Sequence, residues 1–226
     1  MKDLPKINNQ HLFDQAFTHR SYLNESKNEI ESNERLEFLG DSILSFIVSD
    51  HLYKNYTHFD EGILTNLRSL LVNTKSIAKA AKELNFGQYL KLSKGEEDSK
   101  GRENESLLAN SFEAFLGALF LDQGIEKARE FVADMLFPQI EEIVEKKAFK
   151  DPKSLLQEFV QARKQNSPMY KVLHEEGPPH SKIFTIGAFV NQLQIGEGTG
   201  KSKQDAEEQA AEQALAYLQK EGLKEA

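Results

Sequence analysis

Three carboxylates recur at helical spacing near the start of the chain and could act together in chemistry. Glu34, Glu37 and Asp41 are separated by three and then four residues, so a helix would present them on one face. Apolar residues border this face, and like charges beside apolar packing need a compensating positive group. A divalent metal ion would provide one. An ion-pair network built on Arg35 or Arg68 is the alternative that the spacing leaves open.

The composition restricts the chemistry available to these acids. The chain has 226 residues and no cysteine, which excludes disulfides, thiolate metal sites and cysteine nucleophiles, so a metal would need oxygen or imidazole ligands. This length allows one large domain or two small ones. No apolar run approaches the roughly 18 residues of a membrane span, and the first residues lack the apolar segment of a signal peptide. We expect a cytoplasmic protein without a membrane partner.

The formal net charge of −8 argues against a broad nucleic-acid-binding surface. Residues 1–150 carry 19 basic and 25 acidic side chains, and residues 151–226 carry 9 basic and 11 acidic ones. Neither part is basic overall. A nucleic-acid site would therefore have to be a local patch.

The first two thirds of the chain predict an all-α domain. Apolar residues recur every three and four positions, which predicts helices over 12–22, 36–53, 63–84, 107–121 and 125–144. Gly87 is expected to close one helix, Gly124 to open the connection between the last two, and Pro138 to interrupt the last. Residues 94–104 include two glycines and no apolar side chain, which predicts a solvated loop.

A second, α+β domain is expected from residue 152. Asp151 and Pro152 suit the N-cap and first position of a helix, and residues 148–151 form a short linker. Helices are predicted at 152–164 and 203–220, with strands between them at 170–175, 183–190 and 193–198. This α-β-β-β-α order predicts an antiparallel sheet with both helices on one face. The chain is thus multidomain, with a helical domain over 1–147 and a smaller domain over 152–222.

Several segments of the sequence resemble one nuclease family. The run Asn-Glu-Arg-Leu-Glu-Phe-Leu-Gly-Asp-Ser at 33–42 resembles the signature of the ribonuclease III endonuclease domain. Phe-Thr-His-Arg-Ser-Tyr at 17–22 and Leu-Ala-Asn-Ser-Phe-Glu-Ala-Phe-Leu-Gly-Ala at 108–118 are similar to other recurrent stretches of that family, in the same order. The C-terminal unit resembles a double-stranded-RNA-binding domain, through its first helix, Gly-Pro-Pro-His at 177–180 and Gly-Thr-Gly-Lys-Ser-Lys-Gln at 198–204.

The resemblance implies a homodimeric, magnesium-dependent endoribonuclease, with manganese as a substitute metal and no small-molecule cofactor. Such an enzyme cuts both strands of duplex RNA and leaves 5′-phosphate and 3′-hydroxyl ends with short 3′ overhangs, in the processing of rRNA and mRNA. The implied metal ligands are Glu37, Asp41, Asn110 and Glu113, and the implied catalytic residues are Asp41 and Glu113. Asn110 stands where the family has an aspartate. Glu34 and Glu61 are implied to face RNA or the dimer edge of the active-site valley.

In the second domain the resemblance implies three contacts with duplex RNA: Gln157 and Gln161 on the first helix, His180 in a loop, and Lys201 and Lys203 before the last helix. Backbone N–H groups at a glycine-rich helix entry favour phosphate, although a turn with solvated lysines has the same sequence. Duplex RNA would be recognised by its shape.

Two alternatives remain open from the sequence. The uncharged amide of Asn110 and the acidic balance motivate a duplex-RNA-binding protein that does not cut, and a protein-interaction scaffold with a degenerate RNA module is the third hypothesis. His19 is expected to be a structural, hydrogen-bonding histidine.

Overall fold

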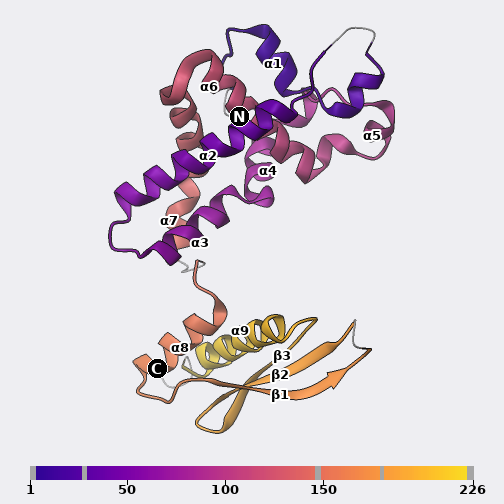
Figure 1. The fold of residues 1–226 in the computed structure, drawn as a ribbon. Coiled ribbons are helices and arrows are strands. Elements are labelled where there is room, and N and C mark those ends of the chain that lie inside the picture. The colour runs from indigo at the N-terminus through magenta and orange to yellow at the C-terminus, as the bar shows by residue number, and fades with distance from the viewer. Residues whose placement is uncertain (1–3, 27–29, 146–148, 179–180, 223–226) are drawn as a thin grey trace. The chain divides into compact units, whose positions relative to one another are not determined.

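The computed structural model describes residues 4–26, 30–145, 149–178 and 181–222, which form two compact units (Figure 1). The first unit ends at Phe149 and the second begins at Lys150. Phe149 is buried in the core of the first unit, so one residue expected in the linker contributes to that unit's packing. The predicted fold class, a helical domain followed by an α+β domain, is confirmed.

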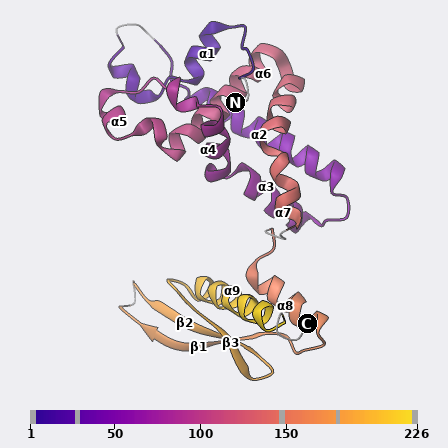
Figure 2. The same ribbon diagram turned by 180° about the vertical axis from the view of Figure 1, so that it is seen from behind.

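The first unit is helical. Its α-helices are α1 (Gln10–Ala16), α2 (Glu34–Asn55), α3 (Glu61–Val72), α4 (Thr74–Glu83), α5 (Lys94–Asp98), α6 (Glu105–Leu136) and α7 (Pro138–Glu145), with short 3-10 helices η1 (Arg20–Asn24), η2 (Phe86–Gln88) and η3 (Gly101–Glu103). α2 packs along α6, and the two helices can be followed from opposite sides in Figures 1 and 2. No helix in the described part of the chain is long and apolar enough to cross a membrane.

Two glycines allow the backbones of α2 and α6 to approach closely. A Cβ atom added at Gly40 would lie 1.8 Å from the carbonyl oxygen of Glu113, and one added at Gly117 would lie 2.4 Å from the carbonyl oxygen of Leu36. Any side chain at either position would push the helices apart. The two glycines therefore set the spacing between the helices that carry the predicted site.

Two predicted helices are divided in the structure. The helix expected over 12–22 ends with α1, because the residues that follow pair with Lys91. The N–H of Lys91 donates to the carbonyl of Phe17 (2.8 Å), and the N–H of His19 donates to the carbonyl of Lys91 (3.1 Å). The helix expected over 63–84 is broken at Asn73, which has an extended backbone (ψ 157°). The side chain of Asn73 accepts from the N–H of Ser76 and caps α4.

The predicted loop over 94–104 instead contains α5 and η3. Ser93 caps α5, and the guanidinium of Arg102 donates to the backbone carbonyls of Gly87 and Leu90, both at 2.8 Å. Polar contacts thus order a segment that has no apolar side chain.

Gly87, Gly124 and Pro138 were each predicted to end or interrupt a helix, and the structure confirms this for Gly124 and Pro138. Gly87 does not close a helix, since α4 ends at Glu83 and the left-handed Asn85 (φ 55°) turns the chain. Gly124 does interrupt α6, with φ 83°, and α7 begins at Pro138 as expected.

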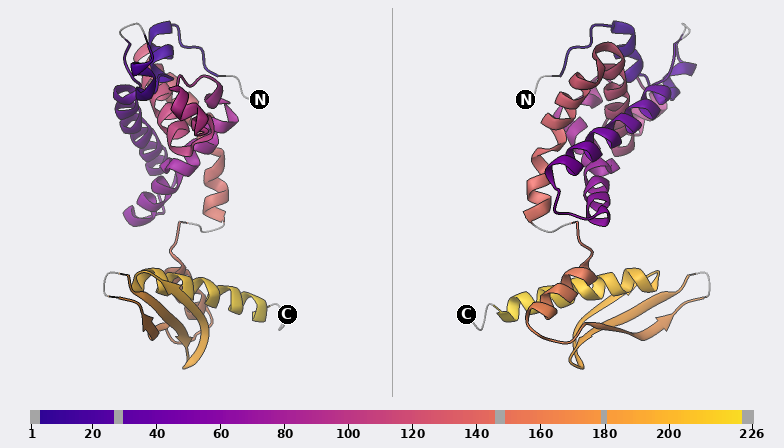
Figure 3. Two further views of the ribbon diagram at one scale, coloured as in Figure 1. Left: turned by 90° about the vertical axis from the view of Figure 1, so that its right-hand side faces the viewer. Right: turned by 60° about the vertical axis from the view of Figure 1, so that its left-hand side comes forward.

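The second unit has the predicted order α8 (Pro152–Ala162), β1 (Met169–Glu176), β2 (Ile183–Val190), β3 (Leu193–Gly200) and α9 (Lys203–Gly222). The strands form an antiparallel sheet in the order β1-β2-β3, and the turn at Asn191 and Gln192 uses positive φ angles of 47° and 70°. α9 packs on β2 and β3, and α8 packs on α9. Both helices cover one face of the sheet, as Figure 3 shows.

Candidate active site

The predicted acidic residues of the first unit meet where α2 crosses α6. Glu34, Glu37 and Asp41 lie in the first turns of α2, and Asn110 and Glu113 lie one turn apart on α6. All five side chains line one cavity of about 590 Å³. Helical spacing places the three acids of α2 side by side, and the close glycine contact brings α6 to them.

Other walls of the cavity come from residues that the sequence did not single out for a role there. Arg20, Asn33 and Leu107 line it, together with His19. The backbone of Ser21 donates to Nδ1 of His19 (3.3 Å), so the histidine has the expected structural bond and also borders the cavity. The sequence does not indicate that residues 19 and 20 lie at the cavity, because the backbone pairing of residues 17 and 19 with residue 91 brings them there.

Burial and neighbouring carboxylates raise the pKa values of two acids in the cavity. Burial, together with the smaller effect of the charges of Asp41 and Glu37, raises the pKa of Glu113 to about 7. Burial also raises the pKa of Glu37, with the charges of Glu34 and Asp41 adding to the effect, while a hydrogen bond from Asn110 opposes it. The cavity is therefore a place where negative charge is costly and a cation is favoured.

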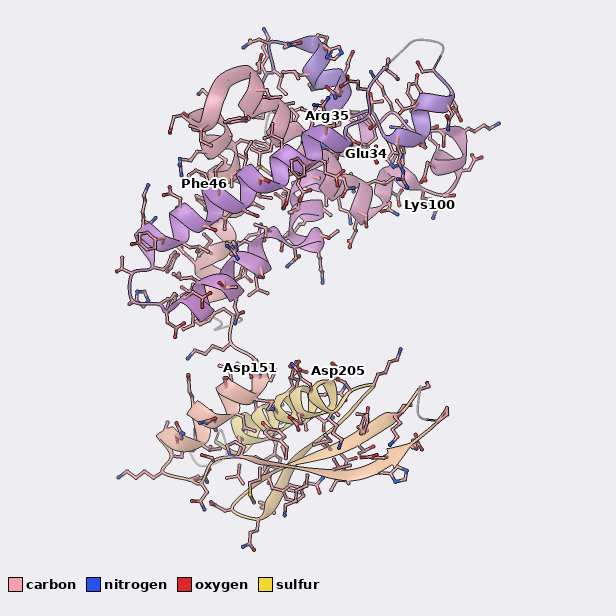
Figure 4. All side chains as sticks on the ribbon, viewed as in Figure 1. Glu34, Arg35, Phe46, Lys100, Asp151 and Asp205 are labelled. Atoms are coloured by element: carbon pink, nitrogen blue, oxygen red, sulfur yellow. The ribbon has the colours of Figure 1, made fainter. Side chains whose placement is uncertain are left out.

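The ion-pair network considered from the sequence is not formed by Arg35 or Arg68 in the described part of the chain. The guanidinium of Arg68 donates to Oγ of Ser49 (3.2 Å). The basic group that does approach the cluster is Arg20, 3.7 Å from Oε1 of Glu34, in a largely exposed pair of the kind that contributes little. Figure 4 labels Glu34 at the start of α2.

The donor set of the cavity suits a hard divalent cation. Such ions prefer carboxylate, amide and water oxygens, and Glu37, Asp41, Asn110 and Glu113 supply the first two kinds from facing helices. Within the described ranges, no three His, Cys, Asp or Glu side chains are close enough together to hold one ion directly. Magnesium retains several of its waters when bound, so bridging water would satisfy the remaining positions.

Glu61 lies apart from this cavity. It is the first residue of α3, where its carboxylate accepts from the hydroxyl of Thr65 (3.2 Å). It lines a different pocket of about 430 Å³, with Tyr53, Phe59 and Arg68 among its walls. The structure of a single chain thus separates Glu34 and Glu61, which the resemblance had grouped.

The expected RNA-facing residues of the second unit are only partly brought together. Gln157 and Gln161 are exposed one turn apart on α8. Lys203 is the first residue of α9 and Lys201 lies two residues before it, both exposed. His180 falls outside the described residues, so the structure says nothing about the contact expected from its loop.

A helical domain with an acidic cavity, joined to an α-β-β-β-α domain, defines a class of protein: a nuclease domain linked to an RNA-binding module. Residues 9–140 match the family described as Ribonuclease-III-like, and residues 152–218 match the double-stranded RNA binding motif. The chain therefore belongs to the ribonuclease III family.

Curated relatives agree over nearly the whole length. The chain is 44% identical over 213 residues to Ribonuclease 3 of Borreliella burgdorferi, covering 94% of this chain and 87% of that one. It is 47% identical over 205 residues to Ribonuclease 3 of Pelotomaculum thermopropionicum, covering 90% and 85%. The protein is an endoribonuclease of this family with a double-stranded-RNA-binding domain, and the comparisons give no support to the non-cutting alternative.

Solved structures show the same folds. The nuclease domain of ribonuclease III from Campylobacter jejuni, in a study of the region involved in dimer formation, matches with a TM-score of 0.53 and 37% identity, over 59% of this chain and 92% of that one. Dicer from Pichia stipitis matches with a TM-score of 0.50 and 27% identity, over 95% and 97%. The family uses a divalent metal ion, for which the donors of the cavity are suited.

Proposed function

We propose that the cavity between α2 and α6 is where this chain hydrolyses the phosphodiester bonds of duplex RNA, with Asp41 and Glu113 as its catalytic residues. The observation that carries the proposal is the convergence of carboxylate and amide oxygens from two helices on one cavity. Attack of water at phosphorus with departure of the 3′-oxygen would leave 5′-phosphate and 3′-hydroxyl ends. Carboxylates from opposite sides of the cavity are placed to accept the proton that leaves the attacking water.

Glu37, Asp41, Asn110 and Glu113 would hold Mg²⁺, with Mn²⁺ able to replace it. When bound, a divalent ion stabilises charge on the phosphate oxygens, lowers the pKa of water and assists the leaving oxygen. The residues themselves hold and orient these participants, and Asn110 does so with an uncharged oxygen. One carboxylate fewer means weaker attraction for the cation than an aspartate at this position would give.

Duplex RNA would also contact residues outside this cavity in each of the two units. The residues proposed to face it are Glu34, Glu61, Gln157, Gln161, His180, Lys201 and Lys203. Support in the second unit comes from the start of α9, where Ser202 caps the helix by accepting from the N–H of Asp205 (3.1 Å), with exposed lysines on either side of the cap. Precursors of rRNA and mRNA are the proposed substrates, in the cytoplasm.

A second copy of the chain is proposed to cover one side of α2. Phe38, Phe46 and Tyr53 are 78%, 56% and 74% exposed, and their spacing of eight and seven residues places them on the same side of the helix. Figure 4 labels Phe46 on this helix. Leu39 and Leu121 line an adjoining pocket of about 610 Å³ with Phe38. Exposed aromatic clusters of this kind mark interaction surfaces.

The dimer can be tested without measuring cleavage. Sedimentation velocity of the purified chain should give the mass of a dimer, and Phe38→Ala should shift the population toward monomer. Ile30→Ala removes another exposed apolar side chain, outside α2, and should leave the dimer intact. A monomeric wild-type chain would contradict the proposal.

Cleavage is tested with a long duplex RNA and magnesium. The wild type should cut the duplex and spare the single strands, while Glu113→Gln should bind without cutting. Glu130→Gln changes an exposed carboxylate paired with Lys127 and should cut normally. Full cleavage by Glu113→Gln would show that Glu113 is not a catalytic residue.

A further inference from the structure

Charged and aromatic side chains meet at the end of the sheet where α9 begins. Glu175 on β1 lies opposite Phe184 on β2, which lies opposite Gly200 on β3. Residues opposite one another on adjacent strands point to the same side of a sheet. A Cβ atom added at Gly200 would lie 2.6 Å from the backbone nitrogen of Ala206, so this side faces α9. Glu175 and Phe184 are therefore directed toward the helix whose first residue is Lys203.

One carboxylate in this cluster contacts two lysines. Nζ of Lys182 lies 3.0 Å from Oε2 of Glu175, and Nζ of Lys203 lies 3.6 Å from Oε1 of the same residue. Both ammonium groups also lie near the ring of Phe184, at 5.9 and 5.5 Å from its centroid. The hydrogen bond from Lys182 lowers the pKa of Glu175, so the carboxylate is charged at neutral pH. Two positive charges beside the expected RNA-binding helix are thus partly neutralised within the domain.

We propose that Glu175 is an internal competitor for RNA phosphate. In the free domain it occupies Lys182 and Lys203, and phosphate oxygens replace it when duplex RNA binds. The proposal rests on the RNA-binding function proposed above for this unit. The two lysine side chains are 43% and 57% exposed, so phosphate can reach them without any change of fold. Ion pairs this exposed are weak enough for a phosphate to displace.

The competitor should lower the affinity for duplex RNA and for duplex DNA by about the same factor. Attraction between lysines and phosphates does not depend on the kind of duplex, and it supplies most non-specific binding. Contacts with 2′-hydroxyl groups distinguish RNA from DNA and do not involve Glu175. A carboxylate that weakens only the attraction between lysines and phosphates therefore leaves the ratio of the RNA and DNA affinities unchanged. Lys201 provides a contrast, since it forms no ion pair with any residue that the structure describes.

The test uses the full chain carrying Glu113→Gln, so that RNA is bound and not cut. Fluorescence anisotropy measures its binding to a duplex RNA longer than about 16 base pairs and to the matching duplex DNA, over a range of salt concentrations. Adding Glu175→Gln should tighten RNA binding about two- to fivefold at low salt. The slope of log K against log salt should become more negative by up to about one. The gain for DNA should be about as large as the gain for RNA.

A matched control separates release of the lysines from a general change of charge. Glu197 is exposed on β3, and its carboxylate accepts from the amide of Gln194 (3.1 Å) and pairs with no lysine in the described chain. Glu197→Gln therefore removes the same charge without freeing a lysine, and should change RNA affinity less than twofold. Lys182→Ala should cost more affinity in the Glu175→Gln chain than in its parent, because in the parent the phosphate contact of Lys182 is offset by the loss of its ion pair with Glu175.

Each other outcome has a defined meaning. Equal or weaker RNA binding by Glu175→Gln, with an unchanged circular dichroism spectrum, would overturn the proposal and make Glu175 a residue that positions the lysines. Additive effects of Glu175→Gln and Lys182→Ala would overturn it as well, and they can be scored even if the first variant lowers stability. A Glu113→Gln parent that binds no duplex RNA would instead refute the RNA-binding function, and the proposal with it.

Discussion

Replacing Glu113 by glutamine should stabilise the metal-free protein while abolishing cleavage. The pKa of Glu113 is raised from 4.5 to about 7, so the folded chain binds more protons than the unfolded chain between these pH values. The free energy of unfolding therefore falls as pH rises through this window, and it stays reduced above pH 7. Glutamine has no charge to bury. Its advantage should be absent near pH 4 and full near pH 8.

The size of the effect follows from the pKa. A rise from 4.5 to about 7 is equivalent to at most about 3.4 kcal/mol, at 1.36 kcal/mol for each tenfold change in proton affinity. The carboxylate lines an open cavity and is partly screened by water, which reduces the expected gain to about 1–2 kcal/mol. For a chain of this length such a gain raises the melting temperature by about 2–8 °C.

The measurement is thermal unfolding followed by circular dichroism, with a metal chelator present, at pH 5 and pH 8. Glu113→Gln should melt higher than wild type at pH 8, and the difference should shrink at pH 5. Glu130→Gln, which changes an exposed carboxylate far from the cavity in sequence, should show no such pH dependence. Magnesium should raise the melting temperature of wild type more than that of Glu113→Gln. A variant that is no more stable than wild type at pH 8 would refute the idea that the charge of Glu113 is costly in the cavity.

Gly40→Ala should cost about 1–3 kcal/mol of stability and lower the cleavage rate, because its Cβ would lie 1.8 Å from the carbonyl oxygen of Glu113. Gly95→Ala is the matched control in thermal unfolding, because no atom lies within 4 Å of the added Cβ. Asn110→Asp adds a fourth carboxylate to the proposed metal ligands, so cleavage should reach half its maximum at a lower magnesium concentration, and an unchanged requirement would count against Asn110 as a ligand. Lys201→Ala should weaken binding to duplex RNA and reduce the salt slope by about one in anisotropy titrations, whereas an unchanged slope would show that it contacts no phosphate.

The fold was predictable where one local pattern decides the structure. The second unit has alternating strands, a two-residue turn and a proline at the start of α8, and its elements fall close to their predicted bounds. The predictions fail where a side chain competes with the backbone pattern. The break at Asn73 depends on a cap that a run of apolar residues does not reveal, and the 94–104 segment is ordered by Arg102, which bonds to distant carbonyls.

The site was predictable on α2 and much less so elsewhere. Spacing alone puts Glu34, Glu37 and Asp41 on one face, but their partners on α6 came only from family resemblance. The acids of α2 and α6 come together because Gly40 lies against the backbone of Glu113, and this contact can be seen only in the folded chain. The wall formed by residues 19 and 20 depends on a backbone pairing with residue 91, which no periodicity indicates.

The acidic balance of the second unit, which argued against nucleic acid, takes on a different meaning once its ion pairs are known. Lysines near the expected RNA-binding elements have glutamate partners within the unit: Lys150 with Glu158, Lys153 with Glu207, and Lys182 and Lys203 with Glu175. A domain whose lysines are neutralised in this way attracts any polyanion weakly, so its affinity must depend on groove width and 2′-hydroxyl contacts, which duplex RNA alone offers. Net charge therefore measures how strongly this unit attracts polyanions of any kind, and it is a poor measure of whether the unit binds RNA.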